Sequence, residues 1–87
     1  MRLIDAKEGT IFEILKFNLP KNIVERFNSL NLSEMSTSYT CYIVEKIVDK
    51  KHIEILFYSK ENRVKILLPK IIIGYDYLDK IEIRTFS

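Results

Sequence analysis

The sequence predicts a mainly β fold, a small barrel of about five strands with one short helix between strands 1 and 2. Two observations predict the strands. Apolar and polar residues alternate in residues 52–58 and 63–68, and β-branched and aromatic residues are dense in residues 10–17 and 39–48. A third observation predicts the helix, because apolar residues in residues 21–30 follow helical spacing.

The first strand and the helix are expected to follow each other closely. Residues 10–17 form the strand, and Pro20 separates it from the next element because proline has no N–H for a β-ladder. The helix, residues 21–30, would pack through one apolar stripe made of Ile23, Val24, Phe27 and Leu30. Asn31 tolerates the left-handed backbone that ends many helices, and the apolar Leu32 is the usual packing partner of such a cap. A helix in this position can plug one end of a barrel, an arrangement typical of SH3-like folds.

The remaining strands are predicted to form a meander and a closing strand. Residues 39–48 and 52–58 are joined by a short polar connection that includes Lys50 and Lys51, so we expect a hairpin. Residues 63–68 add a third strand, which Pro69 is expected to end. The alternation of Ile81 and Ile83 with Glu82 and Arg84 predicts the last strand.

Two segments resemble a known family in residue type and order. The chain opens with MRLIDAKEG, residues 1–9, directly before the first strand, and residues 24–32, VERFNSLNL, carry an arginine in the helix and end on an aliphatic residue. The hairpin and the closing IEI of residues 81–83 follow in the same order. The chain therefore resembles the ferrous-iron transport protein A family of small SH3-like domains.

The resemblance implies a function. It implies a cytoplasmic accessory protein that binds the membrane-embedded GTPase of the ferrous-iron uptake system and modulates its activity, without being an enzyme itself. The same fold also resembles the C-terminal module of iron-dependent repressors, which keeps a regulatory role as an alternative.

Length and charge limit the remaining function classes. With 87 residues the chain can build one hydrophobic core, so we expect a single domain spanning residues 1–87. Its 14 basic and 12 acidic side chains are spread along the chain, and only Lys50-Lys51 and residues 60–65 hint at a basic cluster. Nucleic-acid binding is therefore disfavoured. The alternative function is a small nucleic-acid-binding or regulatory barrel of unassigned role, in which rings such as Tyr42, Phe57 and Tyr58 would stack on bases.

Residues for catalysis or metal binding are scarce. His52 is the only histidine and Cys41 the only cysteine, so we expect no metal, no cofactor and no enzymatic activity, with Cys41 a small buried side chain on a strand. A single cysteine also fits a reducing compartment, and no segment approaches the roughly 20 apolar residues of a membrane span. A cytoplasmic protein without membrane insertion is expected.

Candidate partner-binding residues lie near the end of the chain and on the helix. Three consecutive aliphatic residues, 71–73, cannot all point into one core unless the segment is a buried strand or a short helix turn, so either they pack in the core or at least one of them is exposed. Together with nearby tyrosines they predict a binding surface for a protein partner that includes Ile72, Ile73, Tyr75 and Tyr77. Arg26, on the exposed side of the helix, is a second candidate. An unpaired edge strand in so small a barrel would also support a homodimer.

Overall fold

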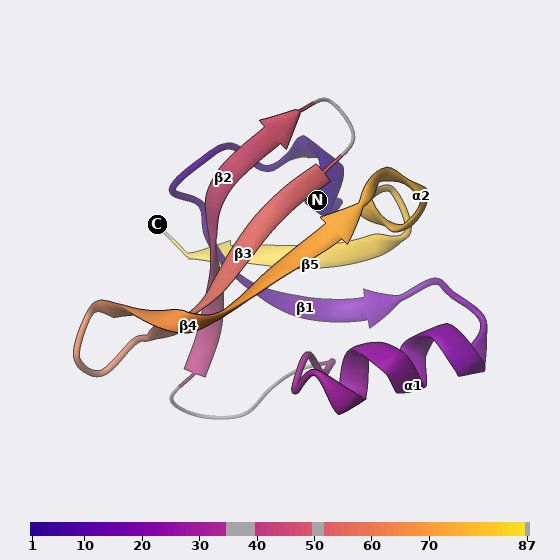
Figure 1. Cartoon of the computed structure of the whole chain (residues 1–87), viewed down its shortest axis with the longest axis horizontal. Helices are drawn as coiled ribbons and strands as arrows, with labels where there is room; N and C mark the ends of the chain where they lie inside the picture. The colour runs from indigo at the N-terminus through magenta and orange to yellow at the C-terminus, as the bar shows by residue number, and fades with distance from the viewer. Residues whose placement is uncertain (35–39, 50–51, 87) are drawn as a thin grey trace.

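The computed structural model describes residues 1–34, 40–49 and 52–86, and these residues form a mainly β domain (Figure 1). The elements, in chain order, are the 3-10 helix η1 (Leu3–Asp5), β1 (Ile11–Phe17), α1 (Lys21–Ser29), β2 (Thr40–Asp49), β3 (His52–Ser59), β4 (Val64–Gly74), α2 (Tyr75–Leu78) and β5 (Ile81–Phe86). The predicted mainly β class is confirmed. Three predicted positions, Tyr39 in the second strand and Lys50 and Lys51 in the connection after it, lie outside the described residues.

The described strands form one open antiparallel sheet in the order β4-β3-β2-β1-β5. β1 pairs with β5 from Ile11 to Phe17, but its register with β2 contains only Ile11↔Ile43 and Phe12↔Tyr42. This short junction divides the sheet into a β2–β3–β4 part and a β1–β5 part, which cross at a steep angle (Figure 1). The two parts can therefore face each other across a core, as the two layers of a small β domain do.

One hydrophobic core is shared by all five strands. Alternating residues of each strand point into it because successive side chains lie on opposite faces of a strand. Leu3 of η1 and Leu78 of α2 are also buried in this core, so the short helices are fixed by packing. The strand residues of this core that are almost completely buried include Phe12, Ile14, Tyr42, Ile55, Ile73, Ile81 and Ile83.

A second row of apolar side chains crosses the opposite face of the sheet. The register places Leu56, Ile43, Ile11 and Phe86 side by side on four neighbouring strands. Leu56 and Ile43 are buried, and the ammonium of Lys60 lies 4.3 Å from the centre of the Phe86 ring. Long cationic side chains therefore extend over this row, in a cation–π geometry at Phe86.

Helix α1 begins where the sequence predicts, ends one residue earlier, and has the predicted cap. Its last carbonyls are capped by a Schellman motif: the Leu32 N–H donates to the Phe27 carbonyl at 3.0 Å and the Asn31 N–H to the Asn28 carbonyl at 2.9 Å. Asn31 has φ +65°, and Leu32 is fully buried. Leu30, predicted for the buried stripe, is instead 49% exposed, because the helix ends one residue before it.

Helix α1 lies between β1 and β2 in the sequence but not in space. It follows β1 and precedes β2 along the chain, as expected, but β1 and β2 pair directly with each other. In Figure 1 the helix lies below β1, where Phe27 stacks on Phe17. The helix therefore covers the β1 part of the sheet and does not separate the two strands.

The left-handed backbone of Asn31 gives a first testable prediction. Replacing Asn31 with alanine is expected to lower the free energy of unfolding by about 1 kcal/mol, because a Cβ without a polar group is strained at positive φ. Replacing it with glycine should change the stability by less than about 0.5 kcal/mol. Urea unfolding of the two variants checks this, and equal losses in both would show that the backbone conformation of residue 31 is not the cause.

The region after residue 68 departs from the sequence prediction. Pro69 does not end a strand: β4 continues through it to Gly74, with a cis peptide bond between Leu68 and Pro69. In the described residues β4 has a neighbour on one side only, and proline is tolerated on an edge strand or at a bulge because no ladder N–H is lost there. The helices η1 and α2 were not predicted, since three or four residues are too few to establish a helical period.

Candidate partner-binding surface

The candidate surface lies where β4 runs into α2. Ile71 and Ile73 are buried, and strand alternation turns Ile72 to the opposite face, where it is 59% exposed. Gly74 ends the strand, and Tyr75, the first residue of α2, is 53% exposed. The structure therefore presents two large apolar side chains to solvent within four consecutive residues.

An open hollow of about 420 Å³ lies at Tyr75 and is lined by His52, Gly74, Tyr75 and Asp76. His52 reaches the hollow because β3 and β4 pair with His52 opposite Gly74. Gly74 contributes no side chain, and a Cβ added there would meet the His52 ring at 4.0 Å, which is an ordinary contact. We define the junction surface as Ile72, Tyr75 and the hollow residues His52, Gly74 and Asp76.

Polar side chains surround the two apolar ones. Strand pairing puts Glu54 opposite Ile72 and Lys46 opposite Glu54, while the imidazole Nδ1 of His52 lies 3.2 Å from a carboxylate oxygen of Asp49. Apolar anchors bordered by charged residues of both signs are typical of small protein interfaces. The arrangement favours recognition of a protein surface over chemistry on a small molecule.

The structure separates the predicted binding residues into different environments. Ile72 and Tyr75 are exposed, as expected for a binding surface. Ile73 is buried in the core, and Tyr77 is half-buried with its ring at an edge-on 5.6 Å from Phe27, so both serve the packing of the domain. Arg26 is exposed on α1, a helix that contributes no residue to the junction surface.

Sequence reasoning missed His52 as a member of this surface. Its approach depends on the register of β3 against β4, which pairs residues 52 and 74 across the sheet. A local pattern cannot reveal that register. The exposed side chains Val64, Ile66, Leu67 and Leu68 on β4 were also not proposed, although three consecutive apolar residues at 66–68 give the same signal as residues 71–73.

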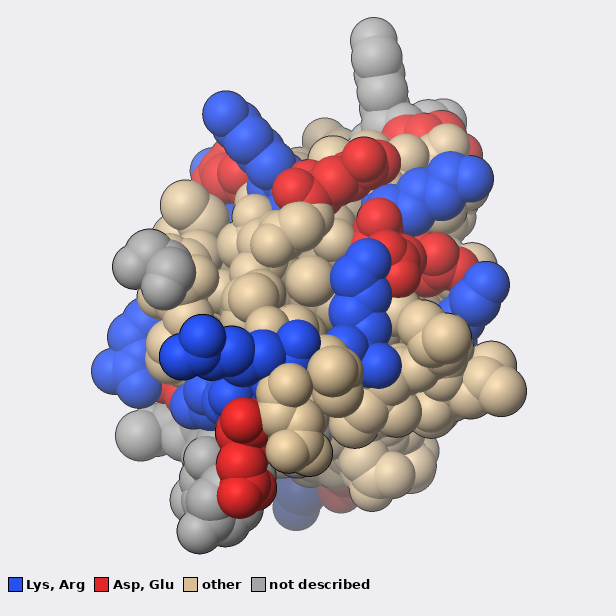
Figure 2. Space-filling view, turned by 90° about the vertical axis from the view of Figure 1, so that its left-hand side faces the viewer, with Lys and Arg blue, Asp and Glu red and all other residues tan. Residues whose placement is uncertain are grey.

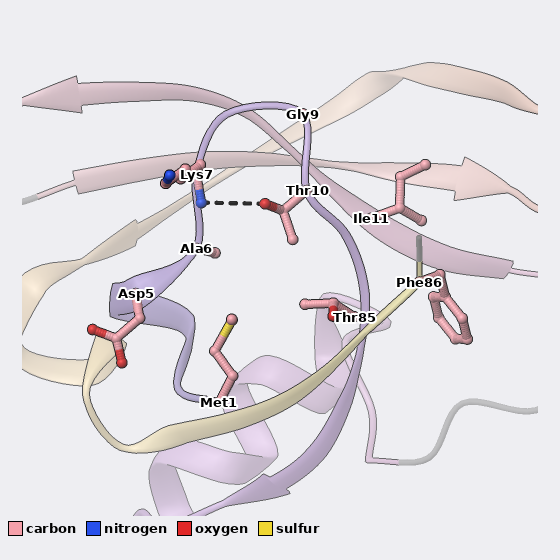
Figure 3. A pocket seen from close by; sticks show the side chains of 9 residues that line it. All are labelled: Met1, Asp5, Ala6, Lys7, Gly9, Thr10, Ile11, Thr85 and Phe86. Carbon is pink, nitrogen blue, oxygen red and sulfur yellow. Dashed lines mark hydrogen bonds between the residues drawn. The ribbon is translucent and has the colours of Figure 1, made fainter.

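A second pocket, of about 290 Å³, lies between the N-terminal segment and the end of β5 (Figure 3). Its polar groups are engaged by the protein itself: the Lys7 N–H donates to the Thr10 hydroxyl at 3.2 Å, and the Thr10 N–H donates to the Lys7 carbonyl at 3.1 Å. Gly9, at φ +85°, closes this turn and donates its N–H to the Val44 carbonyl at 2.7 Å. Bonds within the turn therefore leave few polar groups free to orient a ligand.

Among residues 1–34, 40–49 and 52–86 no three His, Cys, Asp or Glu side chains come together in a way that could hold a metal ion. Cys41 is fully buried, as predicted, and desolvation raises the pKa of its thiol above the ordinary value, an effect that Glu13 increases and Lys60 opposes. The thiol is therefore kept in its protonated, poorly nucleophilic form at neutral pH.

The features expected of a nucleic-acid site are weak. Tyr42 and Phe57 are buried and Tyr58 is half-buried, so two of the three candidate rings cannot stack on bases. Figure 2 shows blue side chains across the middle of one face with red ones close above and below them. Ion pairs such as Lys65 with Glu45 at 2.7 Å and Arg84 with Glu13 neutralise part of this basic charge. These observations count against the nucleic-acid alternative.

Together the fold and the site define a small antiparallel β domain with an exposed apolar surface at the junction of β4 and α2. In the described part of the chain, no helix has the length and apolar character needed to cross a membrane. Comparison with protein-family models, with curated protein sequences and with solved structures gives no significant match.

Proposed function

We propose that this chain is a protein-interaction module that binds a protein partner through the junction surface and catalyses no reaction itself. One observation carries the proposal: Tyr75, more than half exposed, lines an open hollow, and Ile72, also more than half exposed, precedes the hollow residue Gly74 by two positions on β4. Leaving such side chains in water forgoes the free energy of their burial, which a partner can recover. Tyrosine supplies large contact area at low conformational cost, which makes Tyr75 the expected anchor.

The surface stands on a rigid support, which favours binding. Ile71 and Ile73 fix the end of β4 in the core, and Leu78 does the same for α2. A partner would therefore meet a preformed surface and would pay little for ordering the backbone. The support comes from buried residues on either side of Ile72 and Tyr75, so the surface is preformed for any protein partner that fits the hollow.

The SH3-like barrel belongs to the proposal as the finer description of the fold. Five antiparallel strands, a helix after the first strand and a sheet divided into two crossing parts support it. The resemblance of residues 1–9 and 24–32 to the ferrous-iron transport protein A family supports the same fold. It also suggests the first partner to test, the cytoplasmic GTPase domain of a membrane ferrous-iron transporter, and with it a cytoplasmic location.

The test is a pull-down with tagged protein from the native cell, followed by titration calorimetry with the retained partner or with that GTPase domain. We expect Tyr75→Ala to weaken binding by at least about tenfold and Ile72→Asp by more, because the latter also places a charge in the interface. Leu30→Asp is the matched control, an exposed apolar residue replaced by the same acid at the end of α1.

The outcomes of this test separate the proposals. Loss of binding in both junction variants, with Leu30→Asp unaffected and all three folded by circular dichroism, supports the junction surface. Full binding by both junction variants would place the partner elsewhere on the domain. If only nucleic acid is retained, the protein-interaction proposal fails.

A further inference from the structure

A second exposed apolar region lies on the outer edge of β4, away from the junction surface. In the described part of the chain β4 pairs with β3 on one side and has no strand on the other. Four apolar side chains in this region are exposed, and the largest exposed fractions are 65% for Leu67 and 75% for Leu68. We define the β4 edge as residues 64–68, which expose Val64, Ile66, Leu67 and Leu68.

The backbone of this region is also incompletely paired. Residues 64–66 pair with residues 57–59 of β3, and the ladder resumes only at Ile71, opposite Ile55. Residues 67–70 therefore lie opposite Leu56 alone, in a bulge of β4. The most exposed apolar side chains, those of Leu67 and Leu68, thus lie in this bulge. On the outer side of β4, where the described residues place no strand, the backbone N–H and C=O groups have no strand partner, and such an edge invites addition of another strand.

We propose that the β4 edge pairs with the same residues of a second copy of this chain, as antiparallel strands related by a two-fold axis at Ile66. An edge-to-edge pairing of this kind continues the sheet through the dimer and uses the same surface of both copies. It would cover the exposed side chains of residues 64–68 and give their outward N–H and C=O groups partners.

The choice of a second copy rests on how well the strand complements itself in this register. With Ile66 opposite its own copy, Val64 lies opposite Leu68 and Lys65 opposite Leu67, so no like charges meet. In an antiparallel pair, directly opposed residues point to the same face of the sheet. The two-fold axis is perpendicular to the sheet and keeps each residue on its own face, so it must lie midway between the two copies of one residue.

The two neighbouring registers pair less favourable residues across the interface. An axis at Lys65 would oppose two lysines directly, which is destabilising. An axis at Leu67 would place Lys65 opposite Pro69, which lacks an N–H, and Val64 opposite Lys70. Of these three registers, only the one at Ile66 pairs residues 64–68 among themselves, which keeps the two copies of Lys65 apart and leaves Pro69 outside this segment, opposite Arg63.

The charge around the edge is also compatible with a second copy. The Lys65 ammonium lies 2.7 Å from a carboxylate oxygen of Glu45 in the same chain, so it does not bring an uncompensated charge to the interface. The net charge of the chain is only +2, so two copies repel each other weakly at moderate salt.

The first experiment measures the oligomeric state of the whole chain by sedimentation velocity over a range of protein concentration. Because the shared strand is short, we expect a weak dimer with a dissociation constant of about 10–500 μM. Amide hydrogen exchange should slow in residues 64–68 as the concentration rises, while exchange at the junction surface stays unchanged.

Two variants at one position test the register. Leu67 is exposed, so both Leu67→Lys and Leu67→Glu are expected to fold. In the proposed register each variant side chain faces Lys65 of the other copy, twice per dimer. Leu67→Lys should therefore weaken the dimer by about tenfold or more, and Leu67→Glu should leave it within about threefold of the parent protein.

The proposal is overturned by any of three results. A protein that stays monomeric up to about 1 mM has no such dimer. A dimer weakened equally by Leu67→Lys and Leu67→Glu does not use this register. A monomer whose β4 edge is protected only after a different protein is added uses the edge for another partner. Ile72→Asp should leave the dimer intact and Leu67→Lys should leave junction binding intact, so the two proposals can fail separately.

Discussion

Replacing Phe27 with alanine is expected to lower the free energy of unfolding by about 3–5 kcal/mol. Phe27 is the buried residue of α1, and its ring stacks on Phe17 with centroids 5.2 Å apart and planes at 3°. It also meets Tyr77 edge-on, with centroids 5.6 Å apart and planes at 89°. Removing the ring loses both aromatic contacts and leaves a cavity between β1, α1 and α2. Urea unfolding measures the loss.

The effect should be especially large on the helix, because nine residues cannot hold a helix by local hydrogen bonds alone. Hydrogen exchange of the α1 amides is therefore expected to accelerate more than exchange in β3. Phe27→Leu is the control: it keeps most of the apolar volume and should cost about 1–2 kcal/mol. A loss below about 1 kcal/mol for the alanine variant would mean that α1 is not held by this ring.

The sequence predicts an element correctly where the interactions that form it lie within a few residues of one another. Alternation gave the strands correctly where a strand has one buried and one exposed face, as in His52–Ser59 at its start and Ile81–Phe86. The end of α1 was predictable because Asn31 and Leu32 act within their own helix turn. The arrangement of β4 was not, because the rule that proline ends a strand depends on whether the missing N–H would have had a partner.

The candidate surface shows the same division. Exposure of one residue among Ile71, Ile72 and Ile73 could be predicted from the limit on how many neighbours fit one core, and Ile72 is that residue. The burial of Ile73 could not, since it depends on β4 continuing past Pro69. The packing of Tyr77 against the core could not either, since it depends on α2, a turn of four residues fixed by its buried Leu78. The participation of His52 required the register between two strands, which only the assembled sheet establishes.

Tyr42 is expected to be the second position with a large effect, with about 3–5 kcal/mol lost in Tyr42→Ala. The side chain is buried, and its ring centroid lies 5.6 Å from those of Phe12 and Phe57. Its hydroxyl donates to the Asn31 carbonyl and accepts from the Ser33 N–H, each at 3.2 Å. One residue therefore joins the centre of the sheet to the chain that leaves α1. Thermal and urea unfolding check the size of the loss.

Tyr42→Phe separates the two contributions, because it keeps the ring and removes the hydroxyl. We expect it to cost about 1–3 kcal/mol, since two part-buried backbone groups lose their partner. If Tyr42→Phe unfolds at the same urea concentration as the parent protein, the hydroxyl contributes nothing and the ring accounts for the whole effect. Faster hydrogen exchange at Leu32 and Ser33 in this variant, with β3 unchanged, would instead show that the hydroxyl anchors the end of α1 to the core, so that the cap and the sheet stabilise each other through a single side chain.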